Sequence, residues 1–230
     1  MPTKLTVFLV LLLGQVACAP KSVLTAEMQP RSLKALNLEE TLSRRDEVML
    51  AYALTAYDAN NRAVSVVNGG WGVASVRKNE EIALAKQAQP LQLTVPKNGR
   101  VVASVVLIEV DDTGQAQTIL NQIRQIHNVV SVPAGLLLTA TEVLTPLKYI
   151  TAGLTAAGLG VKLVDQFDDD DLLGQSSAQL NERELSAGNI TTTDRTITAD
   201  LTGTNLRDTY AYQLRYDVRL KRVKLTVNRR

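Results

Sequence analysis

Hydrophobic and polar residues alternate through much of the first half of the chain. The clearest run is 48–54, in which every second residue from Val48 to Leu54 is large and apolar. A period of two is typical of a strand with one buried face. We therefore expect this half of the chain to be antiparallel β. The predicted strands are 32–38, 48–54, 64–76, 91–95 and 101–110.

Three groups of small or polar residues separate or interrupt these strands. The segment 58–61 (Asp-Ala-Asn-Asn) predicts a tight turn. Glycines on both sides of Trp71 predict a bulge or bend within 64–76. The pair Asn98-Gly99 is a strong turn signal and predicts a hairpin between the strands on either side.

The period changes in the middle of the chain. Apolar residues from Ala116 to Val130 recur mostly at steps of three and four, as on one face of a helix. A second apolar stretch contains Pro146, and its lysines leave it shorter than the roughly 20 residues of a membrane-spanning helix. We expect an inserted helical pair at about 113–164. This pair either packs on the domain or presents a surface to the membrane or to a protein partner.

The period of two returns after Gly174, in 189–202 and 210–220. The apolar phase reverses at Lys221-Arg222, which predicts a bulge or turn at that point. Strands, a helical insertion and further strands predict a mainly β fold, an antiparallel β-sandwich with an inserted helical pair, over residues 32–230.

The N-terminus has the pattern of a secretory signal. Lys4 precedes an apolar run at 5–13, which is too short to span a membrane, and Val16-Ala17 then leads to Cys18. This segment resembles a bacterial lipoprotein lipobox, although Gln15 stands where that family usually has an aliphatic residue. The resemblance implies a signal peptide at 1–17 and acylation of Cys18. The alternative is ordinary cleavage near Cys18 without a lipid.

The lipoprotein resemblance also implies a place in the cell. A lipid anchor holds a protein on a membrane without a spanning helix. Ala19 follows Cys18 where many inner-membrane lipoproteins have Asp, so the outer membrane of a bacterial envelope is expected. Residues 18–31 include two prolines and are predicted to be a lipidated tether.

Composition removes several classes of function. One Cys and one His cannot form an intrachain disulfide or a Cys/His zinc site. A net charge of +2 argues against a nucleic-acid partner. His127 is the one histidine available as a catalytic base, and no carboxylate at helical spacing orients it. We therefore expect no enzymatic activity and assign no catalytic residue.

Carboxylates gather at the ends of predicted strands. Asp46 and Glu47 open one strand, 109–112 closes another with three acids, and 165–171 contains five aspartates. Like charges this close repel one another, so these loops either stay solvated or bind a cation. Ca²⁺ prefers six to eight oxygen ligands, which such loops can supply.

The acidic segments resemble those of a C2 domain, a β-sandwich with a calcium site in loops at one end. The strand opening 45–49 (Arg-Asp-Glu-Val-Met), the strand end 109–111 (Glu-Val-Asp) and the segment 171–174 (Asp-Leu-Leu-Gly) are similar to the family's three acidic pieces. The family's Pro and Tyr are missing after Asp46, Glu109 replaces an Asp, and the first loop offers only Glu39 or Glu40 as a further ligand. The calcium ligands that the resemblance implies are Asp46, Glu109, Asp111 and Asp171, with Glu40 and Asp165 as further ligands.

Three functions are compatible with these features. The first is a lipid-anchored, non-enzymatic envelope protein that binds Ca²⁺ weakly and contacts a partner or the membrane surface. The second is a structural or assembly lipoprotein without metal binding, and the third is a metal-dependent envelope hydrolase. The basic C-terminal stretch 215–230 either touches anionic lipid headgroups or forms the solvated side of strands.

Overall fold

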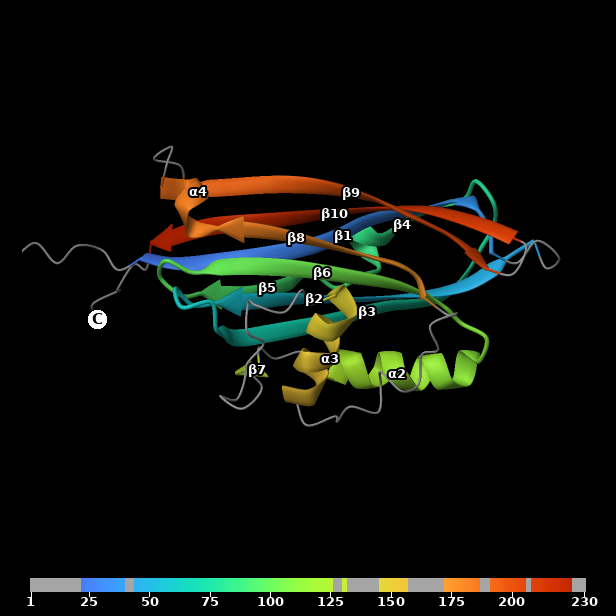
Figure 1. The fold of residues 1–230 in the computed structure, drawn as a ribbon, viewed down its shortest axis with the longest axis horizontal. Coiled ribbons are helices and arrows are strands. Elements are labelled where there is room, and N and C mark those ends of the chain that lie inside the picture. Colours follow the sequence, from blue (N-terminus) through green and yellow to red (C-terminus); the bar gives the residue numbers. More distant parts are fainter. Residues whose placement is uncertain are drawn as a thin grey trace, which may run out of the picture.

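The computed structural model describes residues 22–39, 44–125, 130–131, 145–156, 172–186, 191–205 and 208–224. Two antiparallel sheets face each other, as Figure 1 shows, and a few short helices accompany them. This confirms the prediction of a mainly β, antiparallel sandwich. Several residues that the sequence singles out lie outside the described residues: Cys18, Glu40, His127, Asp165 and Asp171.

The first sheet has the strand order β4-β1-β10-β9, and β5 also pairs with β1. Its centre is a pair of long antiparallel strands that join the beginning of the described chain to its end. Its strands are β1 (Ser22–Asn37), β4 (Glu81–Ala83), β5 (Leu91–Val95), β9 (Thr192–Asn205) and β10 (Asp208–Lys224).

The second sheet has the order β7-β3-β2-β6-β8. Its central strands β2 and β6 are buried along nearly their whole length, because the other sheet covers one face and helices cover part of the other. Its strands are β2 (Asp46–Tyr57), β3 (Ala63–Val76), β6 (Arg100–Glu109), β7 (Val130–Ser131) and β8 (Leu172–Asn181).

Two helices cover the outer face of the second sheet. In Figure 1, α2 (Thr113–Gln125) and α3 (Pro146–Ala156) lie on the side of that sheet away from β1, β9 and β10. Leu120 of α2 is fully buried, in one cluster with Met49 and Val106 of the sheet. Both helices fall within the predicted insertion, and the described part of each packs on the domain. The remaining short helices are η1 (Leu84–Lys86) and α4 (Glu182–Ser186).

Within the described residues, no helix combines the length and the apolar character that crossing a membrane requires.

The predicted tether 18–31 needs correction, because β1 begins at Ser22. Residues 22–30 pair with β10 and alternate between buried and outward positions, with Leu24 and Met28 in the core. Pro30 is compatible with the strand because the register shifts between Pro30 and Ser32. At most three residues then separate Cys18 from the sheet.

The turn at Asn98-Gly99 is present, but the predicted hairpin is wrong. The Gly99 N–H donates to the Pro96 carbonyl oxygen at 3.0 Å, and Asn98 has a φ of 58°. However, β5 pairs with β1, whereas β6 pairs with β2 and β8. Since both edges of β6 are occupied by partners from its own sheet, the turn joins the two sheets instead of two neighbouring strands.

Two other turn predictions are confirmed. The carboxylate of Asp58 accepts hydrogen bonds from the N–H groups of Asn60, at 2.8 Å, and Arg62, at 2.9 Å, and closes the β2–β3 hairpin. Beside Trp71, the register of β2 and β3 shifts, and Gly72 has a φ of 115°. A Cβ at Gly72 would lie 2.7 Å from the Val48 carbonyl oxygen, so this bulge needs a glycine.

The bulge predicted at Lys221-Arg222 is absent from β10. Arg222 pairs with Leu24, and Val223 pairs with Val23, in the same register as the preceding residues. The apolar phase reverses there because Val223 points outward and is 36% exposed.

Candidate functional site

Acidic side chains from separate segments meet at one end of the sandwich. β2 begins there with Asp46 and β6 ends there with Glu109, since the antiparallel register places Val48 opposite Glu109. Glu39, which follows the end of β1, makes hydrogen bonds to both segments. We call Glu39, Asp46, Glu109 and Asp111 the acidic cluster.

Asp46 is the most enclosed carboxylate of the acidic cluster, at 1% exposure. Its Oδ2 accepts a hydrogen bond from the Glu39 N–H at 2.7 Å and another from the hydroxyl of Tyr212. Donors of this kind stabilise an ionised carboxylate that has little contact with water. Because Tyr212 belongs to β10 and Asp46 to β2, the contact also joins the two sheets.

The pKa of the Tyr212 hydroxyl is raised well above its usual value. Burial is the main cause, followed by the hydrogen bond to Asp46 and by the negative charges of Asp46, Glu109 and Glu39. The phenol therefore keeps its proton and remains a donor to Asp46.

Glu109 responds most strongly to the crowding of negative charge. Burial, a hydrogen bond with Glu39, and the charges of Glu39, Asp46 and Asp111 raise its pKa from 4.5 to about 9. At neutral pH Glu109 therefore holds a proton, and it shares a hydrogen bond with Glu39. Neighbouring carboxylates commonly lower their repulsion by retaining a proton in this way.

The neighbouring acids have different roles. Asp111 is exposed and contributes charge. Asp112 caps α2, because its Oδ1 accepts from the N–H groups of Gly114, at 2.8 Å, and Gln115, at 3.1 Å. Of the six implied calcium ligands, the structure thus brings Asp46, Glu109 and Asp111 to one end, whereas Glu40, Asp165 and Asp171 are outside the described residues.

Two residues of this end were not among the implied ligands. Glu39 was the alternative to Glu40 in the first loop, and the sequence alone did not decide between them. Tyr212 stands in a row of apolar residues on β10, where its ring looks like an ordinary core residue. A buried phenol nevertheless needs a hydrogen-bond partner, which is the one signal that pointed to a polar contact.

The donor atoms of the acidic cluster suit Ca²⁺, because all of them are oxygens. In the ranges that the structure describes, however, no three carboxylate, histidine or cysteine side chains are arranged to hold a metal ion. Asp46 is also engaged by Tyr212, and Glu109 holds a proton. An ion at this end would therefore displace that proton and draw further oxygen ligands from elsewhere.

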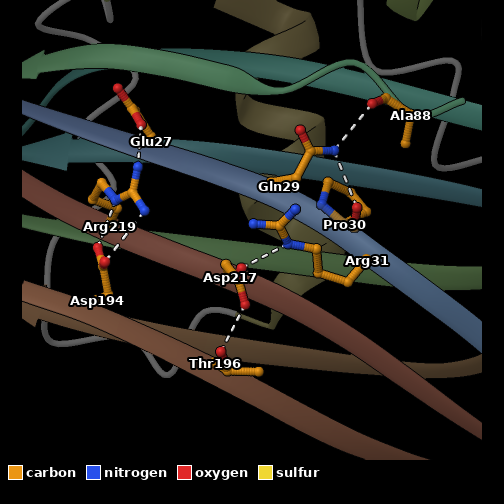
Figure 2. Close-up of polar contacts among 9 residues, drawn as sticks. All are labelled: Glu27, Gln29, Pro30, Arg31, Ala88, Asp194, Thr196, Asp217 and Arg219. Carbon is orange, nitrogen blue, oxygen red and sulfur yellow. Dashed lines mark hydrogen bonds and ion pairs between the residues drawn. The ribbon is translucent and has the colours of Figure 1, made fainter. Parts of the chain in front are cut away.

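A second polar surface covers the outward face of the first sheet. Figure 2 shows Arg219 between Asp194, at 2.6 Å, and Glu27, at 3.6 Å. Arg31 lies 2.6 Å from Asp217 in the same row of strands. These groups line a shallow hollow of about 500 Å³. These charges are paired with one another, and the ion pairs form a ladder across β1, β10 and β9.

No protein-family model matches the chain, and no curated protein matches it. Among solved structures, it is similar to the secretin InvG of the Salmonella SPI-1 type III secretion injectisome, residues 176 to the end, in the open gate state. That match has 7% sequence identity, covers 100% of this chain and 68% of that chain, and has a TM-score of 0.14. Because a likeness at this TM-score carries no argument, the function has to be inferred from the chemistry of the acidic cluster.

Proposed function

We propose that this chain is a non-enzymatic, lipid-anchored protein of the bacterial cell envelope that binds Ca²⁺ weakly at the acidic cluster. The observation that carries the calcium proposal is the convergence of Glu39, Asp46, Glu109 and Asp111 from three segments. A divalent cation would relieve the repulsion that now keeps a proton on Glu109.

Weak affinity is expected from the same contacts. Calcium has to compete with the Tyr212 hydroxyl for Asp46 and with the proton of Glu109. Extracellular calcium modules commonly have dissociation constants of about 10⁻⁴ to 10⁻³ M. An ion present at ten times its dissociation constant stabilises the folded state by about 1.4 kcal/mol, which is enough to raise Tm by a few degrees.

Calorimetry and thermal unfolding with Ca²⁺ test this proposal. Asp111→Asn and Glu109→Gln should weaken binding severalfold, whereas Glu81→Gln, an exposed acid of β4 outside the cluster, should not. No heat and no change of Tm at millimolar Ca²⁺ would contradict the calcium proposal. Mass spectrometry of the purified protein tests the anchor separately, because acylation of Cys18 adds the mass of its lipid.

A structural or assembly role without metal is the second candidate, and the contacts of Asp46 favour it. Its carboxylate already accepts hydrogen bonds from Glu39 and from Tyr212 of the opposite sheet. In this case the acidic cluster serves as an internal polar link between the sheets. A chelator would then leave Tm unchanged, while Asp46→Asn would lower it in the presence and absence of Ca²⁺ alike.

A further inference from the structure

The end of the sandwich opposite the acidic cluster is where the chain enters the sheet. β1 begins there with Ser22, β5 ends there, and β10 ends there with Ser22 opposite Lys224. In Figure 1 this is the end beside the label of the C-terminus. We call it the N-terminal end of the sandwich.

We infer that the N-terminal end is a docking surface for anionic phospholipid headgroups. The inference rests on the proposed anchor at Cys18. Four residues of chain reach at most about 14 Å, so an acylated Cys18 holds Ser22 within that distance of the membrane. The sequence pattern had allowed a tether up to residue 31, whereas β1 leaves no room for the domain to move far from the bilayer.

The charges at this end suit an anionic surface. Ser22, Val23, Lys97 and Arg222 line an open hollow of about 610 Å³ together with Glu182. Arg222 is paired with Glu182 at 2.9 Å, so that acid is already neutralised. Lys97 is exposed and has no ion pair among the described residues. Its ammonium group can therefore bind a phosphate diester at the mouth of the hollow.

The outward side of the first sheet adds a second cation and an apolar contact at the same end. Lys221, opposite Thr25, is exposed and also lacks an ion pair in the described part of the chain. Beside it, Val223 is 36% exposed and pairs with Val23. An exposed valine next to a lysine suits the boundary between headgroups and acyl chains, which accommodates both kinds of side chain.

The far end provides a control within the same molecule. β1 has 16 residues, so its two ends are about 50 Å apart. The Debye length at physiological salt is about 8 Å, so the membrane charge acts on the N-terminal end and not on the acidic cluster. Lys34 of β1, close to the far end, should be insensitive to the lipid.

The full chain in nanodiscs tests the inference by amine labelling and mass spectrometry. Phosphatidylcholine discs are compared with discs that also contain phosphatidylglycerol. We expect labelling of Lys97 and Lys221 to slow by at least about threefold on the anionic discs, because each lysine near an anionic surface gains about fivefold in binding. Labelling should not change at Lys34 or at Lys78, which follows the end of β3 opposite Asp46. High salt should remove the difference at Lys97 and Lys221.

Matched variants provide a second test of the docking surface. Lys97→Gln should reduce the lipid-dependent protection of Lys221, whereas Lys34→Gln should leave it intact. Equal labelling of Lys97 and Lys221 on both kinds of disc would overturn the inference. If mass spectrometry finds no lipid on Cys18, the anchor proposal fails separately. The docking surface can then still be tested by adding anionic vesicles to the chain and measuring the labelling of Lys97 and Lys221.

Discussion

At the scale of single residues, the buried contact between Asp46 and Tyr212 has the greatest weight. Both side chains are at most 1% exposed, and they come from opposite sheets. A hydrogen bond to a buried charge contributes more to stability than one between neutral groups, because the charge has lost its water. The contact therefore contributes to the stability of the fold and also holds the acidic cluster in place.

We predict that Tyr212→Phe lowers the free energy of unfolding by about 1.5 to 3 kcal/mol, because Asp46 loses a donor. Tyr216→Phe is the matched control on the same strand. The Tyr216 hydroxyl lies 3.1 Å from the neutral Ser176 Oγ, so its loss should cost only about 1 kcal/mol. Urea unfolding of both variants measures the difference. Equal losses of unfolding free energy would show that the hydrogen bond from Tyr212 to Asp46 has no special weight.

The acidic residues also show what the sequence could reveal at this scale. The proximity of Asp46 and Glu109 was predictable, because acids where one antiparallel strand begins and its neighbour ends lie at the same end of the sheet. The partnership with Tyr212 was not, since it depends on how two sheets face each other across the core. Nothing in the local sequence distinguishes Tyr212 from Tyr216, whose hydroxyl has a neutral partner.

At the scale of elements, α2 and α3 share one apolar cluster on the second sheet, but α3 also meets polar side chains. Leu120 of α2 rests among apolar side chains. α3 contributes Ile150 and Leu154 to the same cluster, and its Gly153 lies against Asn68, since a Cβ there would be only 2.4 Å from the Asn68 Nδ2. On the same face of the sheet, Thr55 and Ser104 each have a buried hydroxyl oxygen without a hydrogen-bond partner among the described residues. A polar surface of this kind weakens the packing of a helix.

We predict that Thr55→Val stabilises the protein by about 1 kcal/mol, because it removes a buried hydroxyl without a partner and keeps the shape of the side chain. Thr198→Val, on the exposed side of β9, is the control and should change stability by less than about 0.5 kcal/mol. Thermal unfolding compares the two. A loss of stability in Thr55→Val would mean that this hydroxyl is satisfied.

The elements that sequence patterns predicted well are those whose partners are close in the chain. The β2–β3 hairpin followed from the turn at Asp58, which needs only local hydrogen bonds. The partners of β5 and β6 were not predictable from the turn at Asn98-Gly99, because a tight turn can join two sheets as well as two strands. The second half of β1 was predicted, as the strand 32–38, but its first half was missed because Pro20 and Pro30 suggested a tether, although Leu24, Ala26 and Met28 occupy every second position.

At the scale of the whole molecule, the two sheets share one core. Leu33 and Leu214 of the first sheet and Leu50 and Leu107 of the second belong to a single buried cluster. The ends of the sandwich differ in charge, with the acidic cluster at one end and Lys97, Lys221 and Arg222 at the other. This difference is the basis for the two separate surfaces proposed above.

The proton of Glu109 makes the stability of the whole molecule depend on pH. The folded protein holds this proton up to a pKa of about 9, whereas an unfolded glutamate loses it near 4.5. The folded state therefore binds more protons between these values, and the free energy of unfolding should fall as the pH rises from about 4.5 to about 9.

Urea unfolding at several pH values checks this prediction. Glu109→Gln should remove the decline, because glutamine keeps the hydrogen-bonding shape without a charge. Glu81→Gln should retain it. A wild-type stability that is constant or rises over this range would contradict a shared proton in the acidic cluster.

The long pairing of β1 with β10 has a mechanical consequence. A load applied through an anchor before Ser22 would pull along the axis of β1, which is bonded to β10 on one side and to β5 and β4 on the other. Such a load shears many hydrogen bonds at once instead of opening them one after another. The pairing of β1 with strands on both sides would therefore resist such a load along the length of the strand.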